Sequence, residues 1–324
     1  MKIGIIGVGR VGSALSLVLV ARHLVDELVL VGRTRDSARG DALDLLHATA
    51  FGKLTTVRSG DLADTAGSDI IAICLAARDA GWERSSATAQ NFAALEHMIP
   101  SLVAASPKTV FVIATNPVDA MTTLVGRLSG LPPGRVIGTG TLLDTMRLRI
   151  LLSEKCGIAP RDIRAYVLGE HGDSQFAAFS SASAGGGRLA IELIELRRIE
   201  SSVRRAGYDI AKRKGYTNHG IALATTEIIE AIVRDSREIM PLSIRVDGFH
   251  GVHGICLSLP VVVGRGGAVQ RIEVELSSEE IGSFRRSAEM VRQMVNRASR
   301  KYEEPRLVEA GSDLQPASRP DYCI

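Results

Sequence analysis

The sequence predicts an α/β protein built on a doubly wound parallel sheet. The first observation is a series of short apolar segments that read as buried strands, at residues 2–6, 28–31, 69–74 and 110–114. The second is that helical segments separate these strands, beginning with residues 13–22. Strands that alternate with helices indicate βαβ units, in which crossover helices cover the faces of a parallel sheet. The third is a glycine-rich turn between the first strand and the first helix.

This turn, Gly7-Val8-Gly9-Arg10-Val11-Gly12, has the spacing of a dinucleotide-binding fingerprint. Gly7 would make the tight turn, Gly9 would let a pyrophosphate approach the backbone, and Gly12 would allow helix and strand to pack closely. The N–H groups at the start of the helix would face the phosphates. We therefore expect Gly7, Gly9, Arg10, Val11 and Gly12 to bind a dinucleotide cofactor.

The second strand ends in Gly32, where such a fingerprint usually carries an acid that binds the ribose hydroxyls. Arg33, Thr34 and Arg35 follow. Without the carboxylate, a 2′-phosphate would meet no repulsion, and Arg33 or Arg35 could pair with it. The turn formed by Gly32, Arg33, Thr34 and Arg35 therefore favours NADP(H) as the cofactor. The alternative is that the turn is a solvated loop and that NAD(H) binds without its usual anchor.

The candidate catalytic residues lie in two motifs of the second half. His171 stands in the segment Gly169-Glu170-His171-Gly172-Asp173-Ser174, where glycines let backbone and ligand approach closely. Asp144 and Arg147 are three residues apart, so on a helix they share one face. An arginine that grips a carboxylate, an imidazole that exchanges a proton and an aspartate that orients the imidazole together suit a 2-keto acid. Taken singly, the histidine could be structural and the Asp–Arg pair could be a surface ion pair.

The strand–helix pattern changes near residue 145, which predicts two domains and a tail. Residues 1–143 are expected to form the dinucleotide-binding domain, residues 144–300 the substrate domain, and residues 301–324 a surface tail rich in charge and proline. The elements expected in the second domain are a polar helix, two β segments and a closing helix, at residues 191–214, 254–263, 268–276 and 278–300.

Composition narrows the classes of function. The 324 residues carry 39 basic and 36 acidic side chains, a net charge of +3, which gives no electrostatic reason to expect nucleic acid as a partner. The 4 cysteines are scattered singly, without metal-ligand spacing, so we expect reduced thiols, no metal and a cytoplasmic location. No apolar run is long enough to span a bilayer and no signal peptide precedes the first strand, so no membrane partner is expected.

With these motifs in order, roughly residues 1–300 resemble the lactate/malate dehydrogenase family. The resemblance rests on the glycine turn, the segment around His171 and three further motifs, Thr115-Asn116-Pro117-Val118-Asp119, Val136-Ile137-Gly138-Thr139-Gly140-Thr141-Leu142-Leu143-Asp144 and Lys214-Gly215-Tyr216-Thr217. It implies a Rossmann domain followed by an α+β catalytic domain. It also implies reversible hydride transfer between a nicotinamide cofactor and a 2-hydroxy acid, by a homodimer or homotetramer.

The resemblance assigns roles to individual residues. His171 would donate and accept the substrate proton, Asp144 would orient it, and Arg147 would hold the substrate carboxylate. Asn116 would contact the cofactor and the substrate near the reacting carbon. Thr217 would line the substrate pocket.

Substrate choice in this family lies in a loop patterned Gln/Arg-x-x-Gly-x-x-Arg, which Arg78-Asp79-Ala80-Gly81-Trp82-Glu83-Arg84 matches. Arg84 would polarise the substrate carbonyl when the loop closes. By this resemblance, Arg78 occupies the loop position that is arginine in malate enzymes and glutamine in lactate enzymes. A second cation suits a second carboxylate, which favours malate and oxaloacetate as substrates. The preceding segment, Cys74-Leu75-Ala76, departs from the family's Thr-Ala-Gly and is one residue short.

Three alternatives to a malate enzyme stay open. One is an L-lactate or bulkier 2-hydroxy acid dehydrogenase, in which Arg78 pairs with nearby acids in solvent. Another, of a different class, is a non-catalytic dinucleotide-binding protein. The third is a reductase of imines or other 2-keto acids, for which Trp82 and the altered segment before it are the only support. Separately, Arg149 and Arg164 fall at or near positions where bacterial lactate enzymes of the family bind a sugar bisphosphate between subunits, although both could be ordinary surface or interface arginines.

Overall fold

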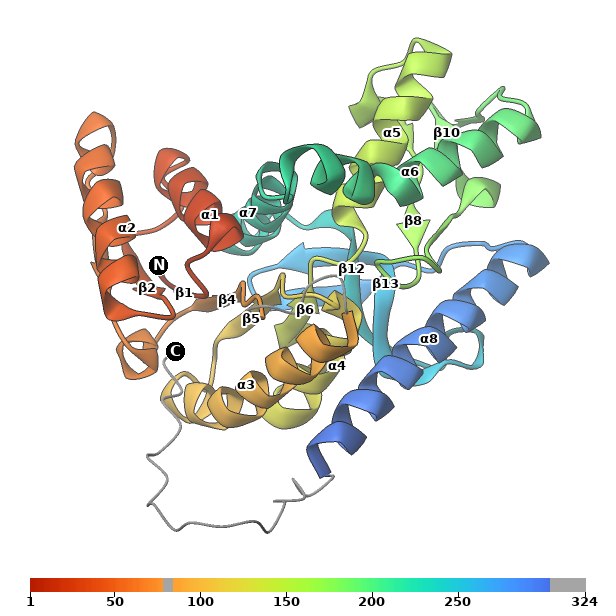
Figure 1. The fold of residues 1–324 in the computed structure, drawn as a ribbon. Helices are drawn as coiled ribbons and strands as arrows, with labels where there is room; N and C mark the ends of the chain where they lie inside the picture. Colours follow the sequence, from red (N-terminus) through yellow and green to blue (C-terminus); the bar gives the residue numbers. More distant parts are fainter. Residues whose placement is uncertain (78–83, 304–324) are drawn as a thin grey trace.

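The computed structural model describes residues 1–77 and 84–303, and the side chains of all of these except residues 84–87 and 299–303 (Figure 1). Arg78 and most of the predicted substrate loop therefore lie outside the described residues, as does the predicted tail from residue 304 onward.

The first half of the chain forms the predicted parallel sheet. Its strands stand in the order β6-β5-β4-β1-β2-β3, and every pair is parallel. The strands are β1 (Lys2–Ile6), β2 (Glu27–Val31), β3 (Thr56–Ser59), β4 (Ile70–Ile73), β5 (Val110–Ile113) and β6 (Val136–Gly138). The helices that connect them are α1 (Arg10–Ala21), α2 (Arg35–Ala48), α3 (Arg84–Ala105) and α4 (Val118–Ser129). The strand order reverses between β1 and β4, where open α/β sheets bind ligands.

The second half of the chain extends the same sheet. Ser243 on β12 pairs antiparallel with Gly138 on β6, and β13 and β14 follow as antiparallel neighbours. These strands are β12 (Glu238–Asp247), β13 (His253–Gly264) and β14 (Gly267–Arg271). The helices are α5 (Leu142–Cys156), α6 (Leu193–Lys214), α7 (His219–Arg234) and α8 (Ser278–Glu303). Two small sheets contain β7 (Ile163–Arg164), β8 (Val167–Leu168), β9 (Phe176–Ala177), β10 (Ser183–Ala184) and β11 (Gly187–Arg188).

Helices cover the two faces of the large sheet, as Figure 1 shows: α1 and α7 lie on one side, and α3, α4 and α8 on the other. Because successive side chains of a strand point to opposite faces, Ile5 packs in the core beneath α1 and α7 whereas Ile6 packs in the core beneath α3 and α4. Both faces of the central strands are thus buried, as in parallel sheets generally. A smaller cluster that includes Leu148 and Val203 joins α5 to α6.

The predicted strands and helices are confirmed, with three differences. Helix α1 begins at Arg10 rather than Ser13, because the glycine turn itself forms its first turn. Strand β14 ends at Arg271, before the acidic residues that follow. Strand β12 was not predicted; in the structure it pairs with β13 along its length, with Pro241 opposite Pro260.

Candidate active site

The predicted histidine, aspartate and arginine meet in one hydrogen-bonded group. Asp144 and Arg147 lie on α5, and His171 lies in the loop between β8 and β9. Asp144 Oδ2 is 2.6 Å from His171 Nδ1, and Arg147 Nη1 donates to the other oxygen, Oδ1, over 2.9 Å. The Asp144 side chain is 2% exposed, whereas that of Arg147 is 17% and that of His171 is 31% exposed. A buried carboxylate therefore holds an imidazole and a guanidinium that can both reach a ligand.

The charges of this group stabilise one another. Burial disfavours the ionised form of Asp144, but His171 and Arg147 outweigh it and lower the pKa of the carboxyl. Burial also disfavours the imidazolium, but the Asp144 carboxylate outweighs it and raises the pKa of His171. With Nδ1 bound to Asp144, Nε2 is the ring nitrogen left to exchange a proton with a ligand.

Close packing at glycines fixes the loop that carries His171. Gly169 has a φ of +87°, and a Cβ there would lie 2.4 Å from Ser287 Oγ on α8. The backbone of Gly169 pairs with that of Ser258 on β13, through bonds of 3.2 and 2.9 Å. A Cβ at Gly172 would lie 2.3 Å from Glu170 Oε1. The loop is therefore attached to the sheet and to α8, which limits where His171 can move.

The glycine turn has the shape that a dinucleotide needs. Gly7 has a φ of +100°, and a Cβ there would lie 2.6 Å from the carbonyl oxygen of Cys74. A Cβ at Gly12 would lie 2.2 Å from the carbonyl oxygen of Gly7. A Cβ at Gly9 would meet no atom within 4 Å, so the backbone there faces open space at the start of α1. Open backbone at a helix N-terminus, beside the switch in strand order, fits a bound pyrophosphate.

The two residues between these glycines face different surroundings. The Arg10 guanidinium lies 4.1 Å from the centre of the Tyr216 ring, in the loop between α6 and α7. Val11 packs against the core beneath α1, so only its backbone can face a cofactor.

The basic turn after β2 is largely occupied by contacts within the chain. Thr34 caps α2, its Oγ1 accepting a hydrogen bond of 3.2 Å from the amide of Ser37. Arg35 pairs with Asp61, and its Nε is 3.0 Å from Asp61 Oδ1. Arg33 is exposed, and no ion pair involves it among the described residues. The prediction that Arg33 or Arg35 receives a 2′-phosphate therefore depends mainly on Arg33.

Packing explains the glycine at the end of β2. A Cβ at Gly32 would lie 2.9 Å from the Cβ of Ala38 on α2. The missing acid can therefore reflect the close approach of helix and strand as well as the choice of cofactor.

The other predicted site residues lie on other segments, two in loops and one at the start of a helix. Asn116 follows β5, and its backbone oxygen accepts a hydrogen bond of 3.0 Å from Asn91 Nδ2 on α3. Thr217 follows Tyr216, the residue on which Arg10 stacks. Arg84 is the first residue of α3, but its side chain, like the whole of Arg78, lies outside the described residues.

The two arginines of the predicted activator site differ in their surroundings. Arg149 is 8% exposed, and its Nε donates to the carbonyl of Ala165 over 3.1 Å. Burial lowers the pKa of Arg149, and the neighbouring Arg164, which is exposed on β7, lowers it further. Within the described part of the chain, no ion pair joins Arg149 to a carboxylate.

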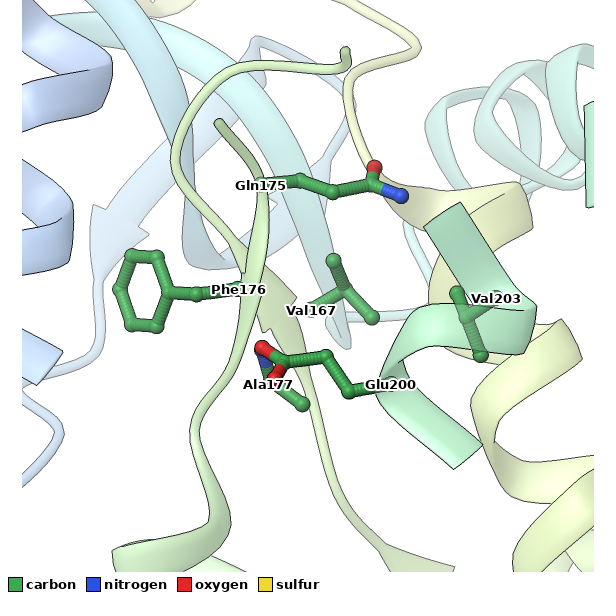
Figure 2. A pocket seen from close by; sticks show the side chains of 6 residues that line it. All are labelled: Val167, Gln175, Phe176, Ala177, Glu200 and Val203. Atoms are coloured by element: carbon green, nitrogen blue, oxygen red, sulfur yellow. The ribbon is translucent and has the colours of Figure 1, made fainter. Parts of the chain in front are cut away.

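A small space lies between β8, β9 and α6 (Figure 2). It has no room for a water molecule. Figure 2 shows Gln175 and Val167 on one side and Glu200 and Val203 of α6 on the other. Gln175 Oε1 is buried there without a hydrogen-bond partner among the described residues. This space is a packing defect rather than a ligand site.

Comparison with known families decides between the classes of protein. The model of the lactate/malate dehydrogenase NAD binding domain matches residues 1–138, and that of the alpha/beta C-terminal domain of the same family matches residues 141–301. The chain belongs to the lactate/malate dehydrogenase family. This dehydrogenase therefore transfers hydride between a nicotinamide cofactor and a 2-hydroxy acid.

Relatives of the dehydrogenase cover nearly its whole length. An L-lactate dehydrogenase of Thermoanaerobacter sp. (strain X514) is 40% identical over 304 residues, which span 91% of this chain and 98% of the relative. An L-lactate dehydrogenase of Synechococcus sp. (strain JA-3-3Ab) is 38% identical over 91% of this chain and 99% of its own length. Crystal structures of a lactate dehydrogenase from a Medee basin deep-sea metagenome library and of the minor L-lactate dehydrogenase of Enterococcus mundtii superimpose with TM-scores of 0.88 and 0.87. Both are 31% identical, and they cover 92% and 91% of this chain and 98% and 97% of their own.

Among the described residues, no three His, Cys, Asp or Glu side chains gather as metal ligands would. No helix within residues 1–77 and 84–303 is long and apolar enough to cross a membrane.

The sequence analysis assigned no role to Asp119, which the structure places against His171. Asp119 is 2% exposed in the first turn of α4, and its Oδ2 accepts a hydrogen bond of 2.7 Å from the backbone amide of His171. Its Oδ1 accepts a bond of 2.6 Å from Ser243 Oγ. The only signal in the sequence was its place after Asn116-Pro117, and an acid at a helix N-terminus is ordinarily explained by the helix dipole.

Proposed function

We propose that this chain is an L-lactate-type dehydrogenase, which interconverts a 2-keto monocarboxylic acid and its L-2-hydroxy acid. The observation that carries the proposal is that Asp144 binds His171 with one oxygen and Arg147 with the other. A proton donor and a carboxylate-binding group are thereby held side by side. The names of the relatives, L-lactate dehydrogenase at 40% and 38% identity, support the choice of a monocarboxylic acid.

The malate preference expected from the sequence rested on Arg78, which is not among the described residues. The relatives favour the alternative of an L-lactate enzyme, so we adopt it. Because Arg78 could bind a second carboxylate, oxaloacetate is the alternative substrate that should be tested beside pyruvate.

Arg147, His171 and Asp144 would have different roles in the reaction. The Arg147 guanidinium would bind the substrate carboxylate with two parallel hydrogen bonds while one of its N–H groups remains on Asp144. In the direction of reduction, Nε2 of protonated His171 would donate a proton to the keto oxygen; in oxidation, neutral His171 would take the proton back. Asp144 keeps the proton of Nδ1 in place and stabilises the imidazolium. The glycine turn would hold the pyrophosphate of the cofactor, whose nicotinamide would supply or accept the hydride.

The proposed positions of the remaining residues follow from their loops. Asn116, at the carboxyl end of β5, would contact the nicotinamide and the substrate, and Thr217 would line the substrate pocket. Arg84, at the start of α3, would polarise the substrate carbonyl. These three roles rest on the family resemblance.

We further propose that the cofactor is NAD(H) rather than NADP(H). Support comes from the match to an NAD binding domain and from the contacts of the basic turn, where Asp61 pairs with Arg35 and Thr34 caps α2. Gly32 is accounted for by its packing against Ala38. An NADP(H) preference would have to rest on Arg33.

Steady-state kinetics test both choices. The kcat/KM for pyruvate and for oxaloacetate would be measured with NADH and with NADPH, in the wild type and in Arg33→Gln, with Arg39→Gln on α2 as a matched control for loss of an arginine. We expect pyruvate with NADH to give the highest value, and Arg33→Gln to change it no more than the control. A preference for oxaloacetate would place Arg78 in the pocket and make this a malate enzyme. The absence of turnover with either acid and either cofactor would contradict the proposed substrates and point to another 2-hydroxy acid.

Assembly, location and regulation complete the proposal. Exposed apolar side chains on α2 and in the segment after it, Leu43, Leu46, Phe51 and Leu54, support self-association as a homodimer or homotetramer. The scattered cysteines support a cytoplasmic location. Fructose bisphosphate distinguishes the two readings of Arg149 and Arg164: a change in substrate saturation would indicate an activator site, and unchanged saturation would leave them as ordinary surface or interface arginines.

A further inference from the structure

Asp119 joins three elements of the fold at one buried carboxylate. It lies on α4, its Oδ1 accepts the hydroxyl of Ser243 on β12, and its Oδ2 accepts the backbone amide of His171 in the loop between β8 and β9. Each oxygen therefore has one donor, and both bonds are short, at 2.6 and 2.7 Å. A hydrogen bond to a charged, buried group is among the stronger ones in proteins, so this contact fixes the backbone position of His171.

His171 is thus held at two points by two carboxylates. Asp144, from α5, binds Nδ1 of the ring, and Asp119, from α4, binds the main-chain N–H. The first contact sets the orientation of the ring, and the second sets the position of the backbone from which the ring projects. Because Asp119 is three residues after Asn116, the same helix start positions the loop on which Asn116 lies.

The charge of Asp119 also acts on His171. Asp119 is 2% exposed, and the ionisable groups that interact with it are Glu170 and His171 in the histidine loop and the buried thiol of Cys256 on β13. Burial raises the pKa of Asp119 to about 7, against the effect of its two hydrogen-bond donors. An ionised Asp119 in turn favours the imidazolium of His171. The ionisation of one side chain is therefore linked to that of the other.

We propose that Asp119 is a positioning residue for His171, which fixes the backbone of the proton-exchanging histidine and, through its negative charge, supports the protonated imidazole. The catalytic part of this inference rests on the proposed function, in which His171 exchanges a proton with the substrate. The geometry behind it, however, can be tested in the ligand-free protein.

Two substitutions separate the charge from the contact. In Asp119→Asn, the amide oxygen can still accept the His171 N–H and the amide nitrogen can donate to Ser243 Oγ, so the contacts remain while the charge is lost. In Asp119→Ala, the amide of His171 loses its acceptor as well. Thr123→Val is the matched control for a disturbance of the same helix. Thr123 is 3% exposed, donates to the backbone carbonyl of Asp119 over 2.7 Å and accepts the amide of Cys256 over 2.8 Å, but its hydroxyl bonds neither the Asp119 carboxylate nor His171.

The direct measurement is the pKa of His171 by NMR titration of the ligand-free protein. The chain has 7 histidines, and His171→Gln identifies the signal of interest. We expect Asp119→Asn to lower the pKa of His171 by about half a unit or more, and Thr123→Val to leave it unchanged. The pH at which keto-acid reduction declines should fall by the same amount. Asp119→Ala, where it folds, should in addition lose about tenfold or more in kcat.

The result that overturns the proposal is an Asp119→Asn variant whose His171 pKa and pH profile match those of the wild type. The same holds if Thr123→Val shifts the His171 pKa as much as Asp119→Asn does. If the wild type turns over no 2-keto acid, the proposed function fails, and the NMR titration still decides whether Asp119 acts on His171.

Discussion

Replacement of Asp144 by asparagine should remove most of the turnover and leave the cofactor site intact. The carboxylate is 2% exposed, and its Oδ2 lies 2.6 Å from His171 Nδ1. Two charges about 4 Å apart interact with about 4 kcal/mol at an effective dielectric constant of about 20. Because 31% of the His171 side chain is exposed, solvent screening reduces this to about 2–4 kcal/mol. That range corresponds to about a 30- to 1,000-fold loss in kcat for keto-acid reduction.

The assay is the reduction of pyruvate followed by NADH absorbance, with NADH affinity measured separately by fluorescence. Glu195→Gln is the matched control, because Glu195 also pairs with a cation on α5, Lys155 at 2.6 Å, but does not touch His171. Asp144→Asn should lose kcat while it keeps its affinity for NADH, and Glu195→Gln should keep both. Equal kcat values for the two variants would refute the role of Asp144.

Three further outcomes follow from the same geometry. Arg147→Leu should raise KM for the keto acid until saturation is lost, with NADH affinity kept; unchanged saturation would exclude Arg147 as the carboxylate-binding group. Gly12→Ala places a Cβ 2.2 Å from the Gly7 carbonyl oxygen, so NADH binding by titration should be lost, and binding at wild-type affinity would show that the turn does not hold the cofactor. Keto-acid reduction needs protonated His171, which holds its proton at low pH and loses it as the pH rises through its pKa. Because that pKa is raised above the ordinary value, the loss should occur at a higher pH than for a free imidazole. The pH profiles of kcat/KM should therefore fall for reduction and rise for oxidation across the same interval, and two flat profiles would contradict this.

The sequence was most informative where a constraint is local. The glycine turn could be predicted because the close contact of Gly12 with the Gly7 carbonyl joins residues only five positions apart in the sequence. Asp144 and Arg147 could be placed together because they share a helix face. The contact of Asp144 with His171, 27 residues later, is not local and was predicted only because the motifs match the family. The parallel strands were predicted because both of their faces are buried and their sequences are continuously apolar.

The sequence could not show contacts between distant segments. Asp119 and Ser243 are 124 residues apart, and nothing in either motif indicates that they meet. Arg35 was expected to be free for a phosphate, but Asp61, 26 residues later, pairs with it. Strand β12 was not predicted, and its place in the sheet depends on antiparallel pairing with β13 and on the pairing of Ser243 with Gly138, which is 105 residues earlier in the chain.

The most direct test of the central claim is the turnover of His171→Gln. If His171 exchanges the substrate proton, kcat for pyruvate reduction should fall by about 100-fold or more, while NADH binds as tightly as to the wild type. Turnover that survives the substitution would show that His171 is not the proton donor, and the assignment of Asp144 and Asp119 as its supports would fall with it.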